Sequence, residues 1–200
     1  MRLLIPFIFL FVFNTLNAAI VEHGNDYNYK YNDRLKLNET SLEKVIKYFG
    51  KPSERYDINT SAAQYVVLRF YMADIKLFTG KARLTYMQFR NGVLNAYVYG
   101  SNYNRDHTKF DYKKAKHIKL GQSIEEISSY IGEPTGKSNC PVNTGQFSGF
   151  CKKGKYTWLW FYAENQGLLD AKNAQAQAFL VGVDADGKAV EITREKITLK

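Results

Sequence analysis

The sequence has few cysteines and histidines, and it has no apolar run long enough to cross a membrane. Its 200 residues include 2 cysteines, 3 histidines and 4 prolines. Cys140 and Cys151 have no histidine nearby, so they lack the four ligands that a structural zinc site needs. The apolar run at residues 3–13 is much shorter than the roughly 20 residues of a transmembrane helix. We therefore predict no metal, no cofactor and no transmembrane segment in the mature chain.

The sequence also lacks a recognisable catalytic set. His23, His107 and His117 stand apart from any motif, whereas a catalytic triad needs a base, a nucleophile and an orienting group that converge. No glycine-rich phosphate loop follows a strand pattern. The stretch "DADG" at residues 184–187 lacks the remaining ligands of an EF-hand and is typical of a hairpin turn. We predict no catalytic residues and no enzyme, with a hydrolase built on His107 or His117 as the open alternative.

The first residues have the pattern of a secretory signal. Arg2 gives a positive start, an apolar stretch follows, and small residues stand at Ala18 and Ala19. We predict a signal peptide at residues 1–18 and a periplasmic or secreted mature protein, with an uncleaved membrane anchor as the alternative. No cysteine follows the predicted cleavage site directly, so a lipid-anchored lipoprotein is not expected. In an oxidising compartment an even cysteine count predicts one disulfide, Cys140–Cys151.

The charge is strongly positive, with 28 Lys and Arg against 19 Asp and Glu and a formal net charge of +9. For a cytosolic protein this would suggest nucleic acid. For an exported protein, anionic lipid, polysaccharide or an acidic protein partner is the more natural counterpart. Solubility alone explains the charge equally well, because the lysines are spread along the chain. We predict no nucleic-acid partner.

One stretch of sequence occurs twice. "LNETSLEKVIKYFGKP" starts at Leu37, and "LGQSIEEISSYIGEP" starts at Leu120. Both have a capping signal, Thr40 with Glu43 and Ser123 with Glu126, then apolar residues at helical spacing. Both end in Gly-x-Pro, a helix stop. Each copy therefore predicts a helix of two to three turns with one buried side.

Strand patterns follow each helix. They are residues 64–72, residues 83–100 with an Asn91–Gly92 hairpin turn, residues 156–163, and residues 176–192 with a turn at 184–187. A helix followed by an antiparallel meander, twice over, predicts an α+β fold of two tandem units, each with short helices on one face of its sheet. The expected division is a flexible segment at 19–34, a first unit at 35–104, a basic connector at 105–117 and a second unit at 118–200 with the disulfide loop.

The alternation of side chains along the strands gives a candidate binding face. If the helices cover Leu68 and Phe70 in the first unit, and Leu159 and Phe161 in the second, aromatic residues and one arginine occupy the other face. That set is Tyr65, Arg69, Tyr71, Tyr86, Tyr97, Tyr99, Tyr156, Trp158, Trp160 and Tyr162. Tyr, Trp and Arg are enriched at binding hot spots. The alternative is that the two units pack sheet against sheet, or that an N-terminal segment covers this face, and that Trp158 and Trp160 are then core. The last strand does not fit this scheme, because Glu191 would face the helix and Ile192 would not.

These motifs resemble a known family. A leucine, a capping Ser or Thr, an apolar helix and Gly-x-Pro before a meander resemble the β-lactamase-inhibitor-like fold, which includes outer-membrane-assembly lipoproteins of the SmpA/OmlA (BamE) type. The tandem form resembles the β-lactamase inhibitory protein family. That resemblance implies a loop disulfide and a concave aromatic sheet that grips a target protein.

From the residues and the resemblance we expect an exported, noncatalytic protein-binding module, inhibitor-like, with an unidentified protein partner. The alternative is a soluble structural or assembly factor of the bacterial envelope that acts at anionic surfaces.

Overall fold

The computed structural model describes residues 27–76, 79–101, 103, 106, 110–140, 151, 156–164 and 175–198. The helices are η1 (a 3₁₀ helix, Tyr29–Arg34), α1 (Leu42–Phe49), α2 (Tyr112–Ala115) and α3 (Ile124–Ile131). The strands are β1 (Glu54–Asn59), β2 (Gln64–Lys76), β3 (Thr79–Arg90), β4 (Val93–Ser101), β5 (Gly136–Asn139), β6 (Trp158–Glu164), β7 (Gln175–Val183) and β8 (Ala189–Thr198).

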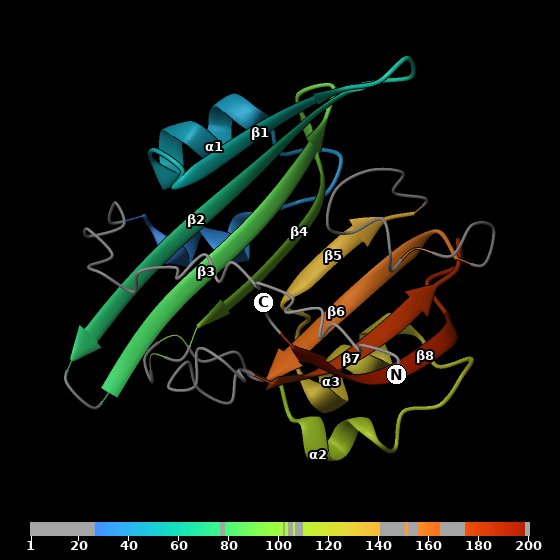
Figure 1. Cartoon of the computed structure of the whole chain (residues 1–200). Coiled ribbons are helices and arrows are strands. Elements are labelled where there is room, and N and C mark those ends of the chain that lie inside the picture. The colour runs from blue at the N-terminus through green and yellow to red at the C-terminus, as the bar shows by residue number, and fades with distance from the viewer. Residues whose placement is uncertain are drawn as a thin grey trace, which may run out of the picture.

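The strands form a single antiparallel sheet of eight strands in the order β1 to β8 (Figure 1). The predicted α+β class is therefore confirmed. The two halves do not have separate sheets, because β4 pairs with β5 through Ala96–Ser138, Tyr97–Lys137 and Val98–Gly136. Both expected hairpins form, and β2 also pairs with β3, from Tyr65–Arg90 to Lys76–Thr79.

The helix caps follow the predicted pattern in one half and differ by one residue in the other. Ser123 caps α3 with the complete capping box, since its hydroxyl accepts from Glu126 N–H and the Glu126 carboxylate accepts from Ser123 N–H. The prediction that Thr40 caps α1 was wrong. Ser41 is the cap and accepts from Lys44 N–H, whereas Thr40 is buried and accepts from Lys36 N–H.

The same backbone contacts attach each helix to a hairpin turn. Leu42 N–H donates to Gly92 C=O in the first half, and Ile124 N–H donates to Gly187 C=O in the second. The preceding cap residues form isolated bridges to the same hairpins, Ser41 to Val93 and Ser123 to Lys188. The Asn91–Gly92 turn has positive φ at both residues (51° and 80°), which a two-residue type I′ turn requires. These contacts place α1 and α3 on the same face of the sheet, here called the helix face.

Two apolar clusters fill the space between helices and sheet. In the first half, side chains from η1 and α1 pack on Val66, Leu68, Phe70, Met87 and Phe89 of β2 and β3. In the second, α3 and the segment before it pack on Tyr162, Phe179, Val181 and Val183 of β6 and β7. Figure 1 shows the sheet from the side away from the helix face, so that the blue η1 lies behind β2 and β3 and α3 lies behind β6 and β7. Burying these large side chains is the main stabilising contribution to such a fold.

The N-terminal part departs from expectation where it is described. Residues 27–34 were expected to be flexible, but Tyr29–Arg34 form η1, and Tyr27, Tyr29 and Asn32 are buried. The predicted signal peptide, residues 1–18, lies outside the described residues. The expected connector contains the short helix α2, whose Lys113 and Lys114 are exposed. Of the described helices, the longest have eight residues, too few to cross a membrane.

Candidate functional site

The sheet register divides the ten predicted binding residues between the two faces. The face away from the helices, here called the opposite face, carries Tyr65, Arg69, Tyr71 and Tyr86, and Tyr156 packs on it further along. The helix face carries the other five, namely Tyr97, Tyr99, Trp158, Trp160 and Tyr162. The structure therefore does not bring the ten residues together.

The tryptophans lie on the helix face because β6 corresponds to β2 with a shift of one residue from the correspondence that the sequence suggested. Val66 pairs with Phe89 beside the first hairpin turn, and Trp158 pairs with Val183 beside the second. Leu68 therefore corresponds to Trp160 and not to Leu159. A slip of one residue moves every side chain of a strand to the other face. The prediction that Leu159 and Phe161 face the helices was thus wrong, and both belong to an apolar cluster on the opposite face.

The corrected alignment also explains which side chains of β8 face the helices. Val181 pairs with Ile192 on the helix face, and Gly182 pairs with Glu191 on the opposite face. Ile192 packs against the second apolar cluster, and Glu191 is directed away from it. The sequence pattern of β8 is therefore consistent with the fold.

A β-bulge moves Tyr97 and Tyr99 to the helix face. A regular two-residue hairpin would pair Tyr86 with Tyr97, but the register shifts between Gln88 and Phe89, and Asn95 has no partner in the ladder. Tyr86 consequently pairs with Val98, and Met87 pairs with Tyr97. An extra residue in one strand reverses the side-chain directions beyond it. Tyr97 is buried, and its ring stacks on that of Tyr99 with an interplanar angle of 2°.

The opposite face of the first half holds a compact group of polar and aromatic side chains, here called the Arg69 cluster. Its members are Glu54, Tyr56, Arg69, Tyr71 and Tyr86. Glu54, Arg69 and Tyr86 are direct partners across β1, β2 and β3. The Arg69 guanidinium donates to Glu54 (Nη1–Oε1 2.8 Å) and lies 5.5 Å from the Tyr71 ring centre and 5.6 Å from that of Tyr86.

Arg69 is oriented by these contacts, and its side chain is 31% exposed. Its Nε is buried and forms no hydrogen bond with a described residue. Tyr56 donates its hydroxyl to Glu54 (2.8 Å), which raises the pKa of Tyr56, and its side chain is largely exposed at 54%. An arginine held by an aromatic ring and a carboxylate loses little side-chain entropy when it binds a partner. None of the described helices lies on this face.

The opposite face continues from the Arg69 cluster into the second half. Tyr86 and Val98 pack against a cluster of Ala96, Tyr156, Leu159, Phe161 and Leu180. The disulfide Cys140–Cys151 joins this cluster, with a Cα–Cα distance of 5.5 Å. Tyr65, a predicted binding residue, is only 4% exposed, so its side chain is not available at the surface.

Trp158 and Trp160 line a groove on the helix face between the two halves. The groove has a volume of about 570 Å³ and is bordered by Leu35–Leu37 and by the start of α3. Lys137 lies with its Nζ 4.1 Å from the centre of the Trp160 ring, and burial lowers the pKa of Lys137. Both tryptophans are partly buried and pack against the second apolar cluster. Their truncation would therefore disturb the core as well as any surface.

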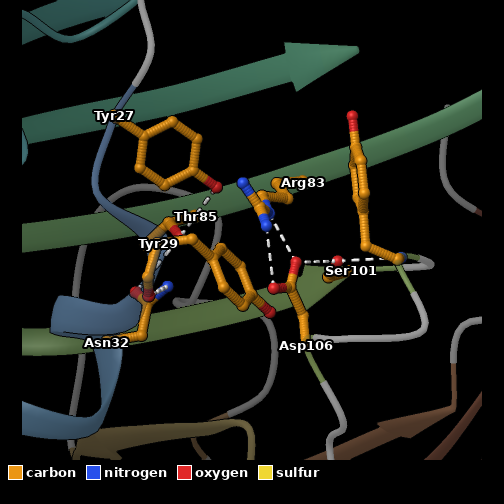
Figure 2. Close-up of polar contacts among 8 residues, drawn as sticks. Tyr27, Tyr29, Asn32, Arg83, Thr85, Ser101 and Asp106 are labelled. Carbon is orange, nitrogen blue, oxygen red and sulfur yellow. Dashed lines mark hydrogen bonds and ion pairs between the residues drawn. The ribbon is translucent and has the colours of Figure 1, made fainter. Parts of the chain in front are cut away.

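A buried polar network attaches the N-terminal segment and the chain after β4 to the sheet (Figure 2). Arg83 of β3 makes a two-pronged ion pair with Asp106, and Ser101 donates its hydroxyl to the same carboxylate (2.6 Å). The Arg83 and Asp106 side chains are 11% and 6% exposed. The Thr85 hydroxyl donates to the Asn32 side-chain oxygen (3.1 Å). The network thus holds η1 against the strand end.

The buried tyrosines predict a loss of stability at alkaline pH. Burial raises the pKa of Tyr27, Tyr29, Tyr97 and Tyr162, and burial with Asp33 and Glu133 raises the pKa of Tyr99 to about 12. An unfolded tyrosine titrates near 10, so above that pH the folded chain binds more protons than the unfolded chain.

The free energy of unfolding should therefore fall as pH rises from about 10 to 12, by up to about 1.4 kcal/mol per tyrosine and pH unit. Burial lowers the pKa of Lys137, so this residue makes the free energy of unfolding rise with pH, but it is one group against five tyrosines. Urea unfolding at a series of pH values, with tyrosinate absorbance, measures the effect. Complete tyrosine ionisation near pH 10 in the folded protein would contradict it.

Sequence reasoning missed three members of these sites. Glu54 and Tyr56 belong to β1, which was not predicted because its polar sequence lacks a clear strand pattern. Asp106 lies in the expected connector, and nothing in the surrounding sequence indicates that it forms an ion pair with Arg83. The contacts of all three depend on pairing between strands or on chain path, which local pattern does not reveal.

Comparisons with known proteins give a limited result. No protein-family model and no curated protein sequence matches the chain. Among solved structures, the chain is similar to a crystal structure described as a "putative beta-lactamase inhibitor protein" from Streptococcus mutans. The two chains are 13% identical, the match covers 83% of this chain and 93% of that chain, and the TM-score is 0.47. The inhibitor-like resemblance of the sequence motifs accordingly stays a prediction.

Proposed function

We propose that this chain is an exported, noncatalytic protein-binding module that uses the Arg69 cluster to hold a protein partner. The supporting observation is the position of the Arg69 guanidinium within 5.6 Å of the ring centres of Tyr71 and Tyr86, on a face where no described helix lies. Arg and Tyr are the residue types that dominate interface energetics. The disulfide is consistent with an oxidising compartment.

The chemistry of the cluster suits a partner surface that offers a carboxylate beside apolar side chains. Arg69 can exchange Glu54 for a carboxylate of the partner, and Tyr56 and Tyr86 supply flat apolar area with a polar end. In this proposal the partner is a protein, and inhibition of an enzyme is the inhibitor-like form of the activity.

Arg69→Ala and Tyr56→Ala should each weaken partner binding by about 2 kcal/mol, roughly thirtyfold, while the fold is retained, since Tyr56 is 54% exposed. Tagged protein would capture partners from secreted and envelope fractions, mass spectrometry would identify them, and calorimetry would give the dissociation constants. A purified β-lactamase is the first enzyme to test directly. Lys44→Ala, an exposed residue of α1 on the other side of the sheet, is the matched control and should bind normally.

Equal binding by wild type and both variants would contradict the proposal. Capture that disappears as salt rises, and that is indifferent to Arg69, would instead favour the anionic-surface role. The tryptophans are unsuitable for this test, because their truncation would disturb the second apolar cluster.

A further inference from the structure

A large cleft lies on the helix face between the two halves of the molecule. Its volume is about 1110 Å³. One wall is η1 with Tyr29, Lys30 and Asp33, and the other is the end of α3 with the following Glu133. Tyr99 of β4 also lines it. This cleft is on the other side of the sheet from the Arg69 cluster and has no part in the function proposed above.

Aromatic rings in fixed orientations line the cleft. The Tyr29 ring meets the Tyr99 ring edge to face, with centroids 5.7 Å apart and an interplanar angle of 89°. Tyr99 in turn stacks on Tyr97 (6.2 Å). Ring faces that border a cavity attract cations through the quadrupole of the ring.

The lining side chains carry more negative than positive charge, although the chain as a whole is strongly basic. They include four carboxylates and three cations. Arg83 is paired with Asp106, and Lys114 with Asp111.

Asp33, Glu133 and Lys30 are all exposed, and none of them forms an ion pair with a described residue, so the unpaired charge of the lining sums to one negative charge. Both carboxylates act on the Tyr99 hydroxyl, since they contribute to its raised pKa. The C-terminal end of α3 adds the negative end of a helix dipole.

One buried polar group in the cleft wall has no hydrogen-bond partner in the described part of the chain. Tyr29 is 8% exposed, its hydroxyl oxygen is buried, and it bonds to none of the described residues. A buried polar group without a partner is destabilising unless something pairs with it. Burial raises the pKa of Tyr29, so the hydroxyl stays neutral and can accept a hydrogen bond from a cation.

We propose that this cleft binds a cationic side chain, an arginine or a lysine, supplied by a partner protein. Asp33 and Glu133 provide the charge, the Tyr99 ring provides a face for stacking, and the Tyr29 hydroxyl accepts a hydrogen bond. An anionic ligand would meet two unpaired carboxylates and the negative end of α3. Arginine fits better than lysine, because its planar guanidinium stacks on rings and donates in several directions.

The test titrates the full chain with N-acetyl-arginine amide and, as the neutral isostere, N-acetyl-citrulline amide, followed by NMR of the tyrosine rings. The arginine probe should shift the Tyr29 and Tyr99 signals saturably, and the citrulline probe should not. Asp33→Asn with Glu133→Gln should weaken binding by about tenfold or more. Glu43→Gln, an exposed carboxylate of α1, should leave it unchanged.

A second variant separates binding from folding. Tyr29→Phe removes an unpartnered hydroxyl, so its thermal midpoint should rise or stay constant while its affinity for the arginine probe falls. Equal shifts with both probes, no saturable shift, or unchanged affinity in the double carboxylate variant would overturn the proposal. The single variants Asp33→Asn and Glu133→Gln repeat the test if the double variant unfolds. These outcomes are independent of partner capture through Arg69.

Discussion

Asp106→Ala should lower the free energy of unfolding by about 3–5 kcal/mol, because it leaves the Arg83 guanidinium buried without its carboxylate. The pair is almost fully enclosed, with side-chain exposures of 11% and 6%. Ser101 would lose its acceptor as well. Chemical denaturation of the variant measures the loss.

The damage should also appear locally. Arg83 lies 5.4 Å from the Tyr29 ring centre, so a displaced guanidinium would disturb η1. Amide exchange at Tyr31, whose N–H donates to Asn28 C=O, should accelerate more than exchange in α3.

A double variant provides the control for this ion pair. Arg83→Met combined with Asp106→Ala removes both charges and should cost less than Asp106→Ala alone, because no buried charge remains unpaired. A loss below about 1 kcal/mol for the single variant would show that the pair is solvated and does not hold the segment.

Gly136→Ala should destabilise the junction between the two halves by about 3 kcal/mol. An added Cβ would lie 2.6 Å from the Tyr97 carbonyl oxygen and 2.9 Å from the Cα of Val98. Both are backbone atoms of β4, so a side-chain rotation cannot relieve the contact. Either β5 separates from β4 or the strand shifts, and the pairing that joins the sheet is weakened.

The matched control is Gly100→Ala, also in the sheet. An added Cβ there meets nothing within 4 Å, so its stability should stay within about 0.5–1 kcal/mol of wild type. Urea unfolding of both variants gives the comparison, and exchange at Tyr99 N–H, which donates to Thr135 C=O, monitors the junction. Equal stability of the two variants would show that β5 can move without cost.

The two proposed sites lie on opposite faces of the sheet and carry charged groups of opposite sign. The Arg69 cluster on the opposite face offers a cation and aromatic rings, whereas the cleft on the helix face offers carboxylates and aromatic rings. The alkaline titration connects to the cleft, because Asp33 and Glu133 raise the pKa of Tyr99. Neutralising both carboxylates should lower that pKa.

Local patterns in the sequence predicted α1, α3, the strands β2 to β4 and the strands β6 to β8, but not η1, α2, β1 or β5. Ser123 with Glu126 marked the start of α3, and Asn91–Gly92 marked the β3–β4 turn, because caps and two-residue turns depend on a few adjacent residues. The cap of α1 could have been found as well. Ser41 corresponds to Ser123 at the same separation of 82 residues as Gly50 and Gly132, whereas Thr40 does not.

The assignment of faces could not be predicted in the same way. β6 reads Trp158-Leu159-Trp160-Phe161-Tyr162, and both of its faces are apolar, so alternation does not indicate which side meets α3. The bulge at Asn95 likewise has no signal in composition. The face of β6 and the position of the bulge both depend on pairing with a strand that is distant in sequence. Each of them places a set of candidate binding residues on the face opposite to the expected one.

By itself, the sequence determined the α+β class, the two capped helices, the hairpins and the disulfide partners, since these follow from short-range geometry and from a cysteine count of two. The tertiary structure alone decided that the halves share one sheet and that Arg69 and Trp160 lie on different faces. The physical reason is the two-residue period of a strand. One bulge or one slipped residue leaves local propensity unchanged and yet turns every following side chain to the other side of the sheet.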